Sequence, residues 1–397
     1  MFSSLKVKYF RIYWLGMFVS LIGTWIQTVT QSWLVFELTN SAFLLGVVGF
    51  LSSIPMFVLS LFGGVLADRV NKRNILIFTQ GAFMLLAFLL AVLTQFKLIT
   101  PLQVMFIALF NGMIMAFDAP ARQSIVVELV GKKHLFNAIT LNSVAFNSSR
   151  IIGPAIAGVL ISVIGMSGCF YLNGVSFFAV IIALLYIKLG KTTAPKNSSA
   201  LGDLKEGLIF IRGNRLILAL VSMVAAVSLF GISYVILMPV FANNVLHVGG
   251  RGLGVLMSSI GIGALIGSFG LASLGDFKFK GRLLIGSVFL FSFSLIAFSL
   301  SKNYLVAILT LILVGCSSFI PIALINTLLQ INVPDAFRGR VMGLFMITFA
   351  GIMPFGNLIS GSLAQSLGVS TALFYCGLAC LVLFTLINFL FPGTRDL

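Results

Sequence analysis

Charged residues are scarce in this sequence. Only 9% of its 397 residues are Asp, Glu, Lys or Arg, and only nine residues carry a carboxylate. Hydrophobic residues make up 59% of the chain, and the mean hydropathy is +1.14. A water-soluble globular domain does not need that much apolar surface. The composition therefore excludes an ordinary soluble protein and indicates an integral membrane protein.

Cysteine and histidine are also rare. All four cysteines lie inside apolar runs, without metal-ligand spacing to either histidine (Cys169, Cys316, Cys376, Cys380, His134 and His247). We interpret these cysteines as small packing side chains. The sequence contains no Walker A loop and no nucleophile with an accompanying base. We therefore expect no metal site, no cofactor, no catalytic residue and no enzymatic activity.

Long apolar runs fill most of the chain. A spanning helix needs ~20 apolar residues, so the length accommodates about twelve. The basic start runs into an apolar segment that lacks a small-residue cleavage site, so we expect a retained first helix. The predicted spans are 11–36, 42–67, 74–96, 101–119, 136–162, 166–188, 215–241, 252–274, 283–301, 303–331, 340–364 and 369–391.

Basic residues are distributed unevenly between the two sides of these spans. Of the 25 Lys and Arg residues, three lie in loops of one side (Lys97, Arg251 and Lys302), Arg150 lies within a span, and the remaining 21 lie on the other side. By the positive-inside rule this bias places both termini in the cytoplasm. The net charge of +16 then reflects topology, so we expect no nucleic-acid partner.

The longest hydrophilic stretch divides the chain into two halves. We predict a six-helix bundle over 1–190, a cytoplasmic linker over 191–214 and a second six-helix bundle over 215–397. The linker contains a short amphipathic segment, with Leu204, Leu208 and Ile211 on one helical face. We expect this segment to lie on the membrane surface.

The halves carry a weak internal repeat. The tripeptide that contains Gly46 recurs 208 residues later around Gly254. Gly153 and Gly158 match Gly356 and Gly361, 203 residues further on. Duplicated halves are a common way to build a transporter with a central site. The sequence therefore predicts an all-α membrane protein with twelve transmembrane helices in two pseudo-symmetric bundles.

A charged turn separates the second and third spans. It reads Gly64-Val65-Leu66-Ala67-Asp68-Arg69-Val70-Asn71-Lys72-Arg73. Its order resembles the loop between the second and third helices of major facilitator superfamily transporters, with Asn71 where that family has Gly. Because Asn tolerates positive φ better than other non-Gly residues, we expect a turn there.

The resemblance implies a gating role for this loop. Asp68 would dock on the start of the eleventh helix, where Arg338 and Arg340 lie, and Arg69 and Arg73 would join a charge network there. An aspartate is stabilised at a helix N-terminus by the macrodipole and the free N–H groups. The alternative is that the basic residues only set topology.

The fifth span contains Gly153, Pro154 and Gly158. This spacing resembles the element that exporters of the superfamily carry in this helix, with Ala157 in place of one glycine. Residues 117–124 and 127–130, with 23–29 upstream, resemble the branch that contains enterobactin, macrolide and multidrug exporters. The resemblance implies export, whereas tight helix packing would explain the same small residues without a direction.

Two polar stripes run along otherwise apolar spans. On the first span they include Thr24, Gln27 and Gln31, and on the fifth span Asn147 and Arg150. Lipid offers no partners to amides and hydroxyls, so we expect these faces to line a substrate cavity. A basic side chain inside a span is a functional candidate. The alternative is hydrogen bonding between helices without a ligand.

Carboxylates are absent from the middle of every predicted span. Proton coupling usually needs a membrane-embedded carboxyl that titrates. Only Asp118 and Glu37, both near span ends, are candidates for it. Capping or ion pairing are the alternative roles of these two residues.

We therefore predict a secondary active transporter of a prokaryotic cytoplasmic membrane. It would export a small amphipathic molecule, siderophore or drug-like, by alternating access coupled to the proton gradient. The expected partners are the small-molecule substrate and membrane lipids, and the expected state is a monomer. Two alternatives are a lipid or lysophospholipid flippase, and a non-transporting membrane sensor or scaffold.

Overall fold

The computed structural model describes residues 3–187, 200–275 and 277–396. Twelve helical segments in this part of the chain are long and apolar enough to cross a membrane, and no strand occurs there. The prediction of twelve spanning helices is therefore confirmed. The predicted linker residues 191–199 and Asp276 lie outside the described residues.

The chain divides into two compact units. Unit 1 contains Met1–Asn40, Leu51–Lys196 and Gly250–Ser258, and unit 2 contains Ser41–Phe50, Asn197–Gly249 and Ser259–Leu397. Each unit thus includes the first part of a helix whose remainder belongs to the other unit. The predicted halves, 1–190 and 215–397, do not include this exchange and stay a prediction.

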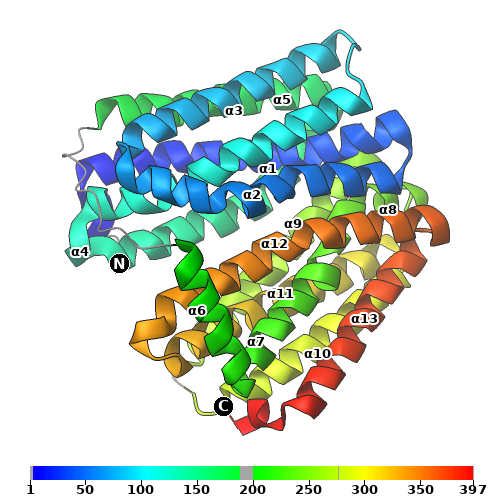
Figure 1. Ribbon diagram of the computed structural model, residues 1–397. Coiled ribbons are helices and arrows are strands. Elements are labelled where there is room, and N and C mark those ends of the chain that lie inside the picture. Colours follow the sequence, from blue (N-terminus) through cyan, green and yellow to red (C-terminus); the bar gives the residue numbers. More distant parts are fainter. Residues whose placement is uncertain (1–2, 188–199, 276, 397) are drawn as a thin grey trace. The chain divides into compact units, whose positions relative to one another are not determined.

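Five long helices dominate the first part of the chain (Figure 1). They are α1 (Lys8–Thr39), α2 (Ala42–Arg69), α3 (Lys72–Gln95), α4 (Pro101–Val163) and α5 (Gly165–Tyr186). Within unit 1, α3 packs along α5, and α1 packs against both α4 and α5. One buried cluster at this interface includes Phe10, Tyr13, Ile125 and Leu184.

Helix α4 contains both the fourth and the fifth span. Gly131, with φ 65° and ψ 175°, breaks it into two pieces, Pro101–Gly131 and Lys133–Val163. Only glycine adopts this backbone conformation readily. Each piece has 31 residues and rises about 46 Å, more than the ~30 Å of a hydrocarbon core. The segment after residue 119, expected as a loop, is therefore a helical extension.

The later part of the chain begins with α6 (Ala200–Gly213), which lies in the predicted linker region. Within unit 2, α6 lies against α12 (Asp335–Leu367) (Figure 1). On the face predicted to lie on the membrane surface, Ile211 is buried within the protein and Leu208 is 48% exposed. The side chain of Leu204 lies outside the described part. Gly207 and Phe210 contact α12. The rings of Phe210 and Phe337 are stacked, with their centroids 4.4 Å apart.

The seventh span is not a continuous α-helix. It consists of α7 (Arg215–Ala226), a π turn (Val227–Gly231), a 3₁₀ turn (Ile232–Leu237) and α8 (Met238–Asn244). Gly356 of α12 packs against the carbonyl oxygen of Leu229 at this break. A larger side chain at residue 356 would collide with that backbone, so the small residue permits the irregular segment.

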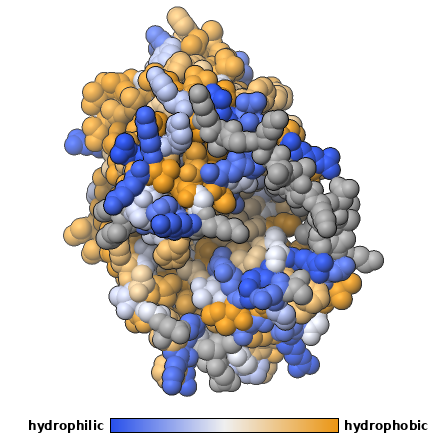
Figure 2. Space-filling model, turned by 90° about the vertical axis from the view of Figure 1, so that its left-hand side faces the viewer, coloured by the Kyte–Doolittle hydropathy of each residue, from blue (hydrophilic) through white to orange (hydrophobic). Residues whose placement is uncertain are grey.

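The remaining helices of the chain are α9 (Gly249–Ser273), α10 (Lys280–Ser299), α11 (Tyr304–Asn332) and α13 (Val369–Leu390). Within unit 2, α10 packs against both α11 and α13. In the view of Figure 2, hydrophilic side chains form several clusters, and hydrophobic side chains are prominent along the left-hand edge. Exposed apolar side chains along spanning helices, such as Phe78 and Leu85 of α3, are suited to contact with lipid.

Candidate substrate site and gating elements

The first and fifth spans meet in a close seam within unit 1. A Cβ atom added to Gly153 of α4 would collide with the Cβ of Trp25 on α1. The Trp25 ring also lies edge-on to Phe146, with ring centroids 6.1 Å apart. Glycine at 153 therefore permits the approach of α1, and the two predicted polar stripes belong to helices that touch.

Arg150 is the functional candidate on this part of α4. It is half-buried and has no hydrogen bond or ion pair with any residue that the structure describes. Its neighbour Asn147 donates its side-chain amide to the Ser143 carbonyl at 2.8 Å, within its own helix. The guanidinium thus retains its five N–H donors for a ligand or water.

The polar stripe of α1 splits between two environments. Thr24 is exposed and donates its hydroxyl to the Ser20 carbonyl at 2.9 Å. Gln27 is only 9% exposed and accepts a hydrogen bond from the Asn173 amide of α5 at 2.7 Å. Gln27 thus bonds α1 to α5, as the alternative of interhelical bonding describes, and its contact with a substrate stays a prediction. Gln31 is half-buried.

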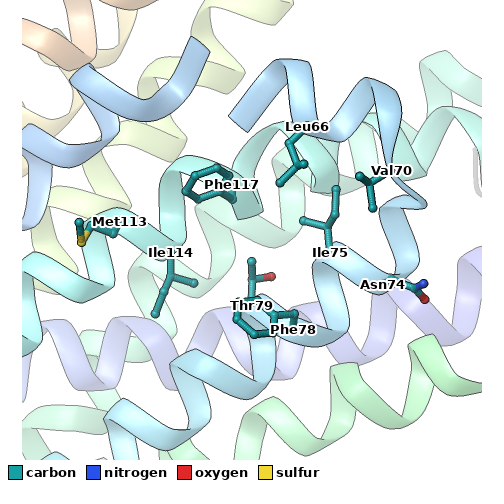
Figure 3. Close-up of a pocket in the computed structure, with 9 residues that line it drawn as sticks. All are labelled: Leu66, Val70, Asn74, Ile75, Phe78, Thr79, Met113, Ile114 and Phe117. Atoms are coloured by element: carbon teal, nitrogen blue, oxygen red, sulfur yellow. The ribbon is translucent and has the colours of Figure 1, made fainter. Parts of the chain in front are cut away.

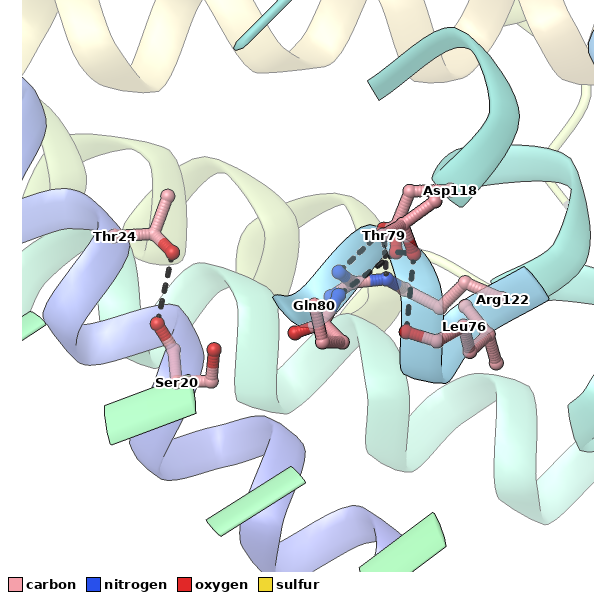
Figure 4. Close-up of polar contacts among 7 residues, drawn as sticks. All are labelled: Ser20, Thr24, Leu76, Thr79, Gln80, Asp118 and Arg122. Carbon is pink, nitrogen blue, oxygen red and sulfur yellow. Dashed lines mark hydrogen bonds and ion pairs between the residues drawn. The ribbon is translucent and has the colours of Figure 1, made fainter. Parts of the chain in front are cut away.

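Asp118 of α4 forms a compact polar cluster with α3 (Figure 4). Its Oδ1 accepts hydrogen bonds from the Thr79 hydroxyl at 2.8 Å and the Gln80 amide at 2.7 Å. Its Oδ2 accepts from Arg122 Nε at 2.8 Å and pairs with the same guanidinium through Nη2. The carboxylate is fully buried, so four donors compensate for its lost hydration.

One polar atom of this cluster lacks a described partner. Gln80 Oε1 is buried and accepts no hydrogen bond from the described residues, and the same applies to the Tyr13 hydroxyl. Glu37, the other candidate for proton coupling, is exposed near the end of α1. Of the two predicted carboxyls, only Asp118 is embedded among polar side chains of a spanning bundle.

The charged turn between α2 and α3 is short, because α2 ends at Arg69 and α3 begins at Lys72. Asn71 has φ −60° and ψ 115°, so it does not take the expected positive-φ conformation. It caps α3 instead, with its side-chain oxygen accepting from the Arg73 backbone N–H at 3.0 Å. Asn is among the preferred N-cap residues, which explains how the chain turns here without glycine.

The basic residues of this turn have different partners. Arg73 donates Nε and Nη2 to the carbonyls of Leu184 and Leu185 at 2.6 and 3.0 Å, at the end of α5. Lys72 is buried and forms an ion pair with Glu128 of α4 at 2.5 Å. Arg69 is exposed without a described partner, and the side chain of Asp68 lies outside the described part. Arg73 thus satisfies carbonyls that a helix end leaves free.

The arginines at the start of α12 are engaged within unit 2. Arg338 pairs with Asp335 at 2.6 Å, and Arg340 pairs with Glu206 of α6 at 2.9 Å. Arg340 also lies over the Phe337 ring, 5.6 Å from its centroid. These contacts connect α6 to the helix end on which the resemblance places Asp68.

The exporter-type element of α4 makes two close contacts within unit 1. Gly153 accommodates Trp25, and Gly158 meets Gly254 of α9, where an added Cβ would lie 3.0 Å from the Gly254 Cα. Pro154 lies inside the helix between them. Gly64 of the charged turn, by contrast, has open space around the position of a Cβ.

The sequence analysis missed the polar partners on other helices. Thr79, Gln80, Asn173 and Ser176 are isolated polar residues in apolar spans, and each is nearly or fully buried. The Ser176 hydroxyl donates to the Asn173 carbonyl at 2.8 Å. The sequence does indicate that such residues have polar partners, because a buried amide in a span needs one. It does not indicate which helix supplies the partner.

Solved structures share this architecture. A bacterial homolog of the human lysosomal transporter Spinster, inward-facing and unoccupied, matches with a TM-score of 0.76 at 14% identity over 98% of each chain. A peptide transporter matches with a TM-score of 0.77 at 12% identity, over 97% of this chain and 94% of that one. At these identities the likeness shows the fold, which is that of major facilitator transporters.

The family follows from sequence comparison. The chain belongs to the transmembrane secretion effector family of the major facilitator superfamily, whose model matches residues 1–395. It is 27% identical to the staphyloferrin A transporter of Staphylococcus aureus, over 89% of this chain and 88% of the relative. It is 26% identical to macrolide efflux protein A of Streptococcus pyogenes, covering 93% and 92%.

The enterobactin exporter of Shigella flexneri is 25% identical, over 85% of this chain and 80% of the relative. The resemblance to the branch of siderophore and drug exporters is therefore confirmed. The protein is a multi-pass membrane transporter of the major facilitator type, and its relatives are transporters rather than enzymes.

Proposed function

We propose that this protein exports a small amphipathic molecule, siderophore or drug-like, by alternating access coupled to the proton gradient. Relatives named as an enterobactin exporter and a macrolide efflux protein support the direction, and these two together with the staphyloferrin A transporter support the substrate class. The excess of basic residues on one side supports a cytoplasmic-membrane protein with both termini in the cytoplasm. We expect it to work as a monomer.

Arg150 is the observation that supports the substrate chemistry. A half-buried guanidinium without a described partner, on a span that packs against α1, attracts groups that are negative or accept hydrogen bonds. Thr24, Gln27, Gln31 and Asn147 would add polar contacts beside it. A carboxylate or catecholate siderophore fits this site better than a purely cationic drug does.

Asp118 is the proposed coupling group. Protonation would neutralise the carboxylate that holds Arg122, Thr79 and Gln80, so proton uptake would loosen α3 from α4. Glu37 stays the second candidate. Gly64, Asp68, Arg69 and Arg73 form the proposed gating turn, in which Arg73 also anchors α5.

Export in intact cells tests this proposal. Cells that express the protein should accumulate less of a siderophore-like anion than cells with an empty vector, and an uncoupler should abolish the difference. Accumulation that increases with expression would show import and overturn the proposed direction. Efflux that persists with the uncoupler would overturn proton coupling.

A further inference from the structure

An apolar pocket of about 450 Å³ lies in unit 1 between the end of α2, the start of α3 and the first part of α4. Leu66 lines it from α2, Val70 from the turn that follows α2, Ile75 and Phe78 from α3, and Ile114 and Phe117 from α4 (Figure 3). Its volume is within the range of small-molecule sites. None of the proposed substrate contacts belongs to it.

The side chains at the pocket's edge indicate that it opens toward lipid. Phe78 is 76% exposed, and it begins an exposed apolar stripe on α3 that continues through Leu85, Leu89 and Val92. Such a stripe on a spanning helix faces hydrocarbon. Leu66 and Val70, at 39% and 38% exposure, are accessible from the same opening. In a bilayer, the molecules that can fill an open apolar space are therefore acyl chains.

The pocket lies close to the adjoining ends of α2 and α3. Helix α2 ends at Arg69 and α3 begins at Lys72, so Phe78 is only about 9 Å along the axis from the start of α3. Arg69 is exposed next to Val70 and has no described partner, and Asn74 lies on the pocket wall. A guanidinium and an amide thus stand at headgroup depth beside an apolar space.

We infer that this pocket binds one acyl chain of an anionic phospholipid, whose phosphate group contacts Arg69 and Asn74. A bound acyl chain would fill the pocket and give the apolar side chains that line it van der Waals contacts that they otherwise lack. The exposed guanidinium favours a headgroup with a net negative charge over one such as phosphatidylcholine, in which the choline cation offsets the phosphate. Lys72 and Arg73 are already committed to Glu128 and the α5 carbonyls.

The pocket also touches the polar cluster of Asp118. Thr79 lines the pocket, and its hydroxyl donates to Asp118 Oδ1 at 2.8 Å. An acyl chain in the pocket would pack on Thr79 and keep that hydroxyl against the carboxylate. Lipid binding should therefore stabilise the α3–α4 contact, so it can be measured as thermal stability without any transport substrate.

The test uses the purified full chain and lipids with identical acyl chains but different headgroups. Phosphatidylglycerol is titrated against phosphatidylcholine, and bound lipid and thermal stability are measured. Arg69→Gln removes the headgroup contact, and Arg282→Gln, an exposed arginine of unit 2, is its control. Ile114→Trp fills the pocket, and Leu102→Trp adds the same bulk at a 61% exposed position of the same helix.

We expect tighter binding of phosphatidylglycerol by the parent, reduced about fivefold by Arg69→Gln and abolished by Ile114→Trp, with both controls unchanged. Equal binding of the two lipids would overturn the headgroup contact. Binding that survives Ile114→Trp would overturn the pocket. If Ile114→Trp does not fold, Met113→Trp fills the same pocket and carries the same expectations. Transport is not part of the readout, so a failure of the proposed export function would leave this test intact.

Discussion

Gly158 of α4 and Gly254 of α9 meet within unit 1 so closely that a Cβ added to Gly254 would lie 2.6 Å from the Gly158 Cα. Gly46 of α2 and Gly361 of α12 meet in the same way within unit 2, where a Cβ added to Gly361 would lie 2.8 Å from the Gly46 Cα. These are the glycines that the internal repeat pairs. The repeat thus has a structural counterpart, because each glycine contact has its copy.

The close contact between Gly158 and Gly254 predicts that a larger side chain is tolerated elsewhere on α9 but not at residue 254. Gly254→Val should lower stability by about 1–3 kcal/mol, since the atoms in the way are backbone atoms that cannot rotate aside. Gly270→Val is the matched control on the same helix, because its added Cβ meets nothing within 4 Å. Thermal unfolding of the two variants checks this. Equal melting temperatures would contradict the importance of the contact.

The Asp118 cluster predicts a large cost for breaking one half of the ion pair. Asp118→Asn leaves the half-buried Arg122 guanidinium without the fully buried carboxylate that pairs with it, which should cost about 3–5 kcal/mol. Replacing both residues, as Asp118→Asn with Arg122→Met, should recover part of the loss. A double-mutant cycle measures the coupling, and additive effects would show that the two residues do not stabilise each other.

The two hydrogen bonds of Arg73 predict that even the conservative change to lysine lowers stability. Arg73→Lys keeps the charge but cannot donate in fork geometry to both Leu184 and Leu185 carbonyls. A loss of about 1.5–3 kcal/mol is expected for bonds from a charged donor. Arg69→Lys is the control on the same turn. A normal melting temperature for Arg73→Lys would mean that these bonds contribute nothing to the fold.

The proposed gating role of Asp68 predicts that substituting this residue reduces transport without reducing stability. Asp68→Asn should insert normally and lose most transport, since the carboxylate is the group that a helix N-terminus stabilises. Transport per molecule in proteoliposomes, beside thermal unfolding, checks both halves of the statement. Activity within about twofold of the parent would remove the gating role from this residue.

The sequence predicted the spans well because hydrocarbon allows few alternatives to apolar helices. It did not predict that Gly131 alone would separate two spans, because a loop and a helical extension are both compatible with a polar segment. Nor did it separate Gln27 from Thr24. Both lie on a polar stripe of α1, but only tertiary packing brings Asn173 to Gln27.

The role of single charges was equally hard to predict. Arg73 and Arg69 read alike in the sequence, whereas in the structure Arg73 donates to the end of α5 and Arg69 is exposed. Asp118 was identified as a candidate because carboxylates near spans are few. Its partners Thr79 and Gln80 were not, since the rotation of α3 against α4 is set by packing rather than by local pattern.

Transport by the reconstituted protein tests the central claim most directly. Proteoliposomes with an imposed pH gradient are supplied with a catecholate siderophore or a cationic dye, and uptake is compared for the parent, Arg150→Ala, Arg150→Lys and the exposed-loop control Lys302→Ala. We predict gradient-driven transport of the siderophore that Arg150→Ala abolishes and Lys302→Ala leaves unchanged. Ligand preference that stays the same in Arg150→Ala and Arg150→Lys, with reduced thermal stability in both, would contradict the anion site.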